Sequence, residues 1–194
     1  MGDWKLEREF LSFETAWVTL RGENYLDEAG RTLEYYRVEK ADSVIALPLQ
    51  AGRILVPPAQ YRPGLGGSTI DFPGGRVDPE AGPRAGALRV LERELGVSEE
   101  MIDRLIALDG RGWPVNSSFS NQKLYGYVAH IRHEAAVPGA GPVTATGGDE
   151  AAPRGFDLTS DGLAALLEEL DCLQCRAVLF QYLLSARRGD LFPR

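Results

Sequence analysis

The chain has 194 residues, of which 44% are hydrophobic and 25% charged, a size and composition that indicate one globular domain with at most a small additional unit. Its formal net charge of −7 argues against electrostatic binding to duplex nucleic acid or to an anionic membrane, but it allows a single basic pocket for a small anion. Neither a signal peptide nor an apolar stretch long enough to cross a membrane is evident, and the two cysteines are too few for a disulfide framework. We therefore expect a cytoplasmic protein.

The first half of the chain is rich in β-forming residues. The segments 12–23 (SFETAWVTLRGE) and 32–40 (TLEYYRVEK) are predicted strands, joined by a turn at Gly30. They indicate an N-terminal β-hairpin subdomain over residues 1–42, ahead of a main domain over residues 43–194.

The main domain opens with a second predicted hairpin over residues 43–62, where two apolar runs flank QAGR. PGLGGST, residues 63–69, is a predicted flexible link, and TIDFP, residues 69–73, a short strand.

The hydrophobic period then changes to that of a helix. Residues 84–95 carry leucines at helical spacing, with Pro83 suited to the first turn and Gly96 suited to ending it. SEEMIDRLIAL, residues 98–108, is predicted as a short second helix capped by Ser98.

The remaining chain predicts a strand, a loop and C-terminal helices. KLYGYVAHIRHE, residues 123–134, is the strand, and the Gly/Ala/Pro-rich residues 135–155 form a long loop. The helices cover 159–170 and 172–188, as two helices or one broken helix. This order predicts a mixed α+β fold.

The stretch from Gly74 to Val97 resembles the signature of the Nudix hydrolases. That signature has a glycine, five residues, a glutamate, seven residues, and then R-E-U-x-E-E-x-G-U, where U is aliphatic. Anchored on Gly75, this chain matches it at the following positions: Arg89, Leu91, Glu94, Gly96 and Val97. The preceding QYRPGLGGSTIDFPGG is similar to ADP-ribose pyrophosphatase-like members. The resemblance covers about residues 4–170 and implies a Nudix fold, a mixed β-sheet sandwiched between helices.

The resemblance also implies a phosphoanhydride hydrolase that uses Mg²⁺ or Mn²⁺, held by glutamates on one face of the signature helix. At about 100° per residue, positions 90, 93 and 94 share a face. They are Val90, Arg93 and Glu94 here, and the earlier signature glutamate is replaced by Ala81. Glu94 is thus the one expected metal ligand on the helix, and we expect a weakened metal site.

The resemblance assigns the other site residues. Glu94 and Arg89 are expected to be catalytic, with Glu150 from the late loop. Asp78, Glu80 and Asp149 are further carboxylates that could assist Glu94. The residues expected to contact substrate are Arg62, Arg76, Arg93, Gly75, Trp113 and Gln122.

Two of these assignments have plainer alternatives. Guanidinium groups suit phosphate oxygens, but the favoured alternative is that Arg93 is a solvated helix charge pairing with Glu92 or Glu100 and that Arg89 is a structural ion-pair partner. Trp113 could stack on a base or cover one end of the β-structure.

Three functions therefore stay open. The first is a hydrolase of nucleoside diphosphate–X compounds, such as ADP-ribose or sugar nucleotides, with an altered metal site. The second is a non-hydrolytic protein that binds a small phosphorylated ligand, and the third an enzyme with metal-free chemistry. By resemblance, we also expect a homodimer built partly through the N-terminal strands.

His130, His133, Cys172 and Cys175 could suggest a zinc site, but the spacing is unusual and residues three apart on a strand point to opposite faces. A redox role for the Cys-x-x-Cys pair lacks the βαβ context that such motifs have. Both are disfavoured relative to structural roles.

Overall fold

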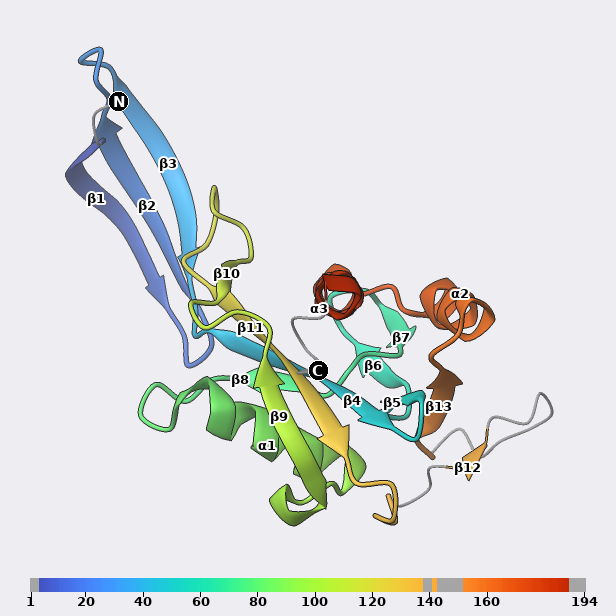
Figure 1. The fold of residues 1–194 in the computed structure, drawn as a ribbon. Coiled ribbons are helices and arrows are strands. Elements are labelled where there is room, and N and C mark those ends of the chain that lie inside the picture. The colour runs from blue at the N-terminus through green and yellow to red at the C-terminus, as the bar shows by residue number, and fades with distance from the viewer. Residues whose placement is uncertain (1–3, 138–140, 143–151, 189–194) are drawn as a thin grey trace. The chain divides into compact units, whose positions relative to one another are not determined.

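The computed structural model describes residues 4–137, 141–142 and 152–188, which form two compact units (Figure 1). The N-terminal unit comprises residues 1–42 and 113–124, and the main unit comprises residues 43–112 and 125–194. The predicted boundary after residue 42 stays a prediction. In the structure, residues 113–124 also belong to the N-terminal unit.

The N-terminal unit is built on a three-stranded antiparallel sheet, not on the expected hairpin. Its strands are β1 (Lys5–Glu14), β2 (Thr19–Leu26) and β3 (Thr32–Glu39), in the order β1-β2-β3. The predicted strand 12–23 is wrong because a turn divides it. The Thr15 hydroxyl accepts hydrogen bonds from the backbone N–H groups of Trp17 (3.1 Å) and Val18 (2.9 Å), which reverses the chain between β1 and β2.

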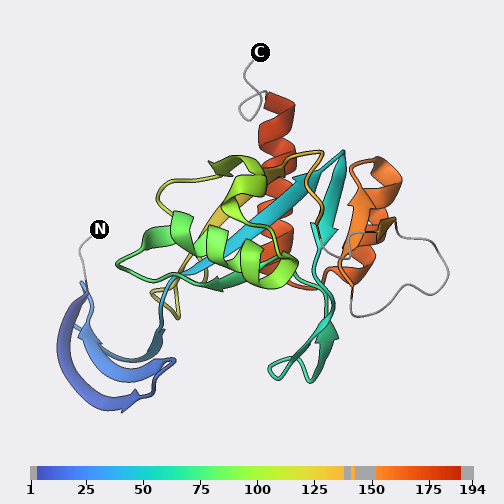
Figure 2. The ribbon, with the colours of Figure 1, turned by 90° about the horizontal axis from the view of Figure 1, so that it is seen from below.

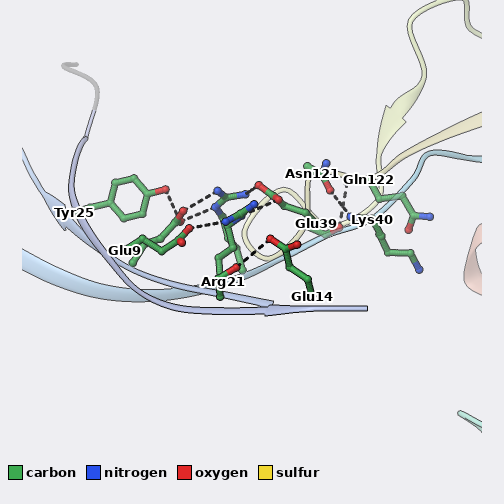
Figure 3. Close-up of polar contacts among 12 residues, drawn as sticks. Glu9, Glu14, Arg21, Tyr25, Glu39, Lys40, Asn121 and Gln122 are labelled. Atoms are coloured by element: carbon green, nitrogen blue, oxygen red, sulfur yellow. Dashed lines mark hydrogen bonds and ion pairs between the residues drawn. The ribbon is translucent and has the colours of Figure 1, made fainter. Parts of the chain in front are cut away.

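Charged side chains stabilise this sheet (Figure 3). Arg37 donates to both oxygens of the fully buried Glu23 (2.6 and 2.8 Å), and the Tyr25 hydroxyl donates to the same carboxylate (2.8 Å). Arg21 bonds Glu39 at 2.8 Å and also reaches β1. The hydrogen bonds from Arg37 hold the pKa of Glu23 below its usual value, because they favour the ionised form.

Residues 113–124 pack on this unit. They contain β10 (Trp113–Pro114), which pairs with the first residues of β11 (Lys123–Ile131). The backbone N–H of Lys40 donates to Asn121 Oδ1 (3.0 Å), and Gln122 Nε2 donates to the Ala41 carbonyl (3.1 Å). Both amides therefore act as structural links within the unit.

The main unit is a mixed sheet with helices on both faces. Within this unit the strand order is β11-β4-β5-β13-β12, with β8 paired to β4 and β9 to β11. The helix α1 (Gly82–Leu95) and the helix α3 (Leu173–Arg188) lie on opposite sides of β4 (Figures 1 and 2), and α2 packs beside β13. The remaining elements are β4 (Ser43–Gln50), β5 (Arg53–Val56), β6 (Gln60–Arg62), β7 (Gly67–Thr69), β8 (Gly74–Arg76), η1 (Glu99–Met101), β9 (Ile102–Ala107), β12 (Gly141–Pro142), β13 (Arg154–Asp157) and α2 (Ser160–Glu169).

The helix α1 has the predicted extent and ends as predicted. Gly96 is left-handed (φ 65°), its N–H donates to the Glu92 carbonyl, and the N–H of Val97 reaches back to Leu91. Leu91 and Leu95 are buried in the core that α1 forms with β4. This packing fixes the orientation of the helix face that carries the site.

Three other expectations are wrong. Residues 98–108 form one 3₁₀ turn followed by β9, not the expected helix. The pairing of Leu105 and Ile106 with β11 outweighs the local helical preference. The Ser98 side chain makes no capping hydrogen bond. Residues 63–69 are not a loose link. They form the β6–β7 hairpin, in which the Arg62 carbonyl accepts from Leu65 and Gly66 (both 2.9 Å). The strand expected at 69–73 is displaced to β7.

The long loop expected at 135–155 is interrupted by β12 and by the first residues of β13. The C-terminal region contains two separate helices. No helix within the described ranges has the length and apolarity needed to span a bilayer.

Candidate functional site

The surviving signature carboxylate, Glu94, is held between α1 and the strand β8. Gly74 donates its backbone N–H to Glu94 Oε2 (3.4 Å). Arg93 donates from Nη2 to Glu94 Oε1 in a short contact, and the same nitrogen donates to the Gly74 carbonyl (2.8 Å). The Glu94 side chain is 11% exposed and that of Arg93 is 55% exposed. Both carboxylate oxygens therefore already accept protein hydrogen bonds.

Gly75 permits this arrangement by lacking a side chain. A Cβ at this position would lie 2.9 Å from Val90 Cγ1 and 3.4 Å from Arg93 Nη2. The structure thus brings Val90 and Arg93 together over Gly75, as the helical geometry predicts. Val90 is fully buried in the core, so position 90 presents an apolar surface and contributes nothing polar to the site.

The other signature arginine, Arg89, also bonds to the chain beside the helix. Its Nη2 donates to the carbonyl of Arg76 (3.0 Å), at the end of β8. Two consecutive turns of α1 therefore clamp β8 through guanidinium groups, from Arg89 at one end and Arg93 at the other. Arg76 itself is exposed.

Arg62 lies at the end of β6 and pairs with Asp71. Its Nε and Nη2 approach Asp71 Oδ2 at 2.9 and 2.6 Å. The remaining predicted substrate contacts, Trp113 and Gln122, belong to the N-terminal unit, where Trp113 is half-buried and Gln122 is buried. Asp149 and Glu150 lie outside the described residues.

Glu94 is the only described carboxylate of the signature helix face, so the described donor set makes a poor site for a Mg²⁺ or Mn²⁺ ion. Such ions need several oxygen ligands. Within the described ranges, Glu94 joins no group of three His, Cys, Asp or Glu side chains close enough to share a cation. Asp78 instead accepts the backbone N–H of Glu80 (3.0 Å), and the Arg93 guanidinium already bonds to Glu94.

One cluster of possible metal ligands was not predicted from the sequence. Asp71, Cys172 and Cys175 place their ligand atoms within 4.8 Å of one another. Among the described residues, this is the group of three side chains that could hold a metal ion, and it includes neither His130 nor His133. The zinc site with two cysteines and two histidines, disfavoured from the sequence, is therefore not formed. A hydrogen bond from Cys175 lowers the pKa of the Cys172 thiol to about 6, and the same bond, together with burial, raises the pKa of Cys175.

Comparisons with known proteins agree with this fold. No family model matches the chain. The ADP-sugar pyrophosphatase of mouse (Mus musculus) is 29% identical over 106 residues, an alignment covering 49% of this chain and 49% of that enzyme. The chain therefore matches about half the length of that curated relative.

A solved structure, described as the crystal structure of an ADP compounds hydrolase, superposes with a TM-score of 0.74 at 15% sequence identity, covering 98% of both chains. This similarity confirms the α+β Nudix fold expected from the signature. At this identity it establishes the fold alone.

Proposed function

We propose that the chain is a Nudix-type hydrolase of nucleoside diphosphate–X compounds, such as ADP-ribose or nucleoside diphosphate sugars, with a weakened divalent-metal site. The similarities to an ADP-sugar pyrophosphatase and to an ADP compounds hydrolase support the substrate class. The resemblance of residues 74–97 to the Nudix signature implies Mg²⁺ or Mn²⁺ as the cofactor.

The observation that carries the weakened site is the contact between Arg93 and Glu94. A cation that bound Glu94 through Oε1 would have to displace the guanidinium, and a cation on either oxygen would be repelled by it. Arg93 is more than half exposed, so its side chain has room to move aside. We therefore expect slow hydrolysis that needs a high metal concentration.

A second candidate function rests on the same arginine. Both hydrogen bonds of Arg93 come from Nη2, so Nε and Nη1 have no acceptor among the described residues. These N–H groups could receive the oxygens of a phosphate. In this alternative the protein binds a phosphorylated ligand without a metal and without turnover.

One assay separates the two. The chain is incubated with ADP-ribose and a panel of sugar nucleotides plus Mg²⁺ or Mn²⁺, and phosphate is measured after phosphatase treatment. We expect turnover that Glu94→Gln abolishes and that the matched variant Glu92→Gln, on the exposed side of the same helix, retains. Absence of turnover, with thermal stabilisation by ADP-ribose in chelator, would favour the binding function instead.

We also propose a homodimer formed through β1. This strand is an edge of its sheet, nearly every residue in it is exposed, and Leu6 and Phe13 are 55% and 61% exposed. Long exposed edge strands favour pairing with another chain. Light scattering should give twice the chain mass, and Phe13→Lys should shift it toward the monomer.

A further inference from the structure

We propose that Asp71, Cys172 and Cys175 form a binding site for a thiolate-preferring cation of the Zn²⁺ type. The site lies between the start of α3 and the segment joining β7 to β8. It does not include Glu94 and does not depend on the proposed hydrolysis.

Local structure presents the two thiols together. Cys172 directly precedes α3, and its carbonyl accepts the N–H of Arg176, which begins the helix. Cys175 lies three residues further on, in the first turn, where an i,i+3 spacing places side chains on the same helix face. Two cysteines separated by two residues also have the usual spacing of a zinc-binding pair.

The third ligand comes from a segment about a hundred residues earlier in the chain. Cys175 Sγ lies 3.9 Å from Asp71 Oδ1. A tetrahedral zinc ion, at about 2.3 Å from sulfur and about 2.0 Å from oxygen, needs a sulfur–oxygen separation of about 3.5 Å and a sulfur–sulfur separation of about 3.8 Å. The separation between Cys175 and Asp71 therefore needs to shorten by about 0.4 Å. The two separations that involve Cys172 lie within 4.8 Å and need to shorten by about 1 Å at most.

Arg62 orients the carboxylate for this role. Both of its contacts go to Asp71 Oδ2, at 2.6 and 2.9 Å, which turns Oδ1 toward the thiol. Ligating carboxylates in metal sites are commonly held by such an outer hydrogen bond. Arg62 therefore acts as a positioning residue for this site.

The ligand chemistry selects the cation. Two sulfurs and one oxygen suit zinc and its neighbours, whereas Mg²⁺ and Ca²⁺ need oxygen ligands throughout. Three protein ligands leave a fourth position for water. The ion can reach the site because Cys172 is only half-buried. A disulfide between the two cysteines would not involve Asp71, whereas a metal ion would bind its carboxylate. A dependence on Asp71 therefore distinguishes metal binding from disulfide formation.

The test is a Co²⁺ titration of the full chain, reduced and freed of metal by a chelator. We expect one equivalent of Co²⁺ to give the intense visible bands of tetrahedral coordination and a thiolate charge-transfer band, both removed by Zn²⁺. Cys172→Ser should abolish the charge-transfer change. Asp71→Asn and Arg62→Ala should each weaken affinity by at least about 10-fold.

The matched control is Asp157→Asn, which also removes a carboxylate paired with an arginine, Arg53 at 2.9 Å. It should leave Co²⁺ affinity unchanged. Native mass spectrometry of the unmodified protein should show one bound zinc, which keeps the proposal testable even where a variant fails to fold. Three results would each overturn the proposal. The first is that Co²⁺ gives no tetrahedral spectrum, and the second is that Asp71→Asn leaves the Co²⁺ affinity unchanged. The third is that the cysteines oxidise to a disulfide while the reduced protein takes up no metal.

Discussion

Replacing Arg93 by methionine removes the guanidinium while keeping a long side chain over Gly75. In the native protein that guanidinium bonds Glu94 Oε1, one of the two carboxylate oxygens that could bind a divalent ion. A dication on this oxygen would lie about 4 Å from the guanidinium, where the repulsion in a water-like dielectric is about 2 kcal/mol. Arg93→Met should therefore tighten Mn²⁺ binding by about 30-fold.

Mn²⁺ binding to the variant can be followed by electron paramagnetic resonance of the unbound ion, with sugar-nucleotide hydrolysis measured over the same metal range. The control is Arg84→Met, which removes an arginine of the same helix that pairs with Glu99 at the surface (2.9 Å). Equal Mn²⁺ affinities in the native protein and Arg93→Met would refute the reasoning, because the guanidinium would then not oppose the metal.

Two further predictions concern stability. Gly75→Ala should lower the free energy of unfolding by about 1–3 kcal/mol, because the new methyl would lie 2.9 Å from Val90 Cγ1. The control is Gly64→Ala, whose new methyl would have no atom within 4 Å and should leave the free energy of unfolding nearly unchanged in the same denaturant titration. Hydrogen bonds from Arg37 lower the pKa of Glu23 in the folded protein from its ordinary value of 4.5. The stabilisation that the ionised Glu23 provides is therefore complete above pH 4.5, and it is lost as the pH falls through the lower pKa of the folded state. Melting temperatures across this range should show that loss, and Glu23→Gln, already destabilised at neutral pH, should show a smaller one.

The elements with a clear apolar period were predictable from sequence. The helix α1 follows from leucines at helical spacing between Pro83 and Gly96, and the β4–β5 hairpin from two apolar runs around a glycine turn. The strand β1 was missed because nearly all of its residues are exposed, which leaves no apolar face to detect. The local pattern of β9 predicts a helix instead, because the pairing of this strand with β11 is a tertiary contact that no local pattern shows.

The site was predictable in part for the same reason. Helical geometry alone places Val90 and Arg93 on one face with Glu94, and the structure shows Arg93 bonded to that carboxylate. The burial of Val90 was not predictable, since it depends on how α1 packs on β4. The contact of Asp71 with Cys175 joins two segments distant in sequence, so no motif could reveal it.

The central claim is that Arg93 and the missing carboxylates leave Glu94 a poor ligand for a divalent ion. Its most direct test is an Mn²⁺ titration of the native protein alongside ADP-ribose hydrolysis. We predict a Kd of about 1 mM or weaker, taking the loss of two ligands as at least about 3 kcal/mol, with slow turnover that follows metal occupancy. Stoichiometric Mn²⁺ binding at micromolar concentration with rapid turnover would contradict the account.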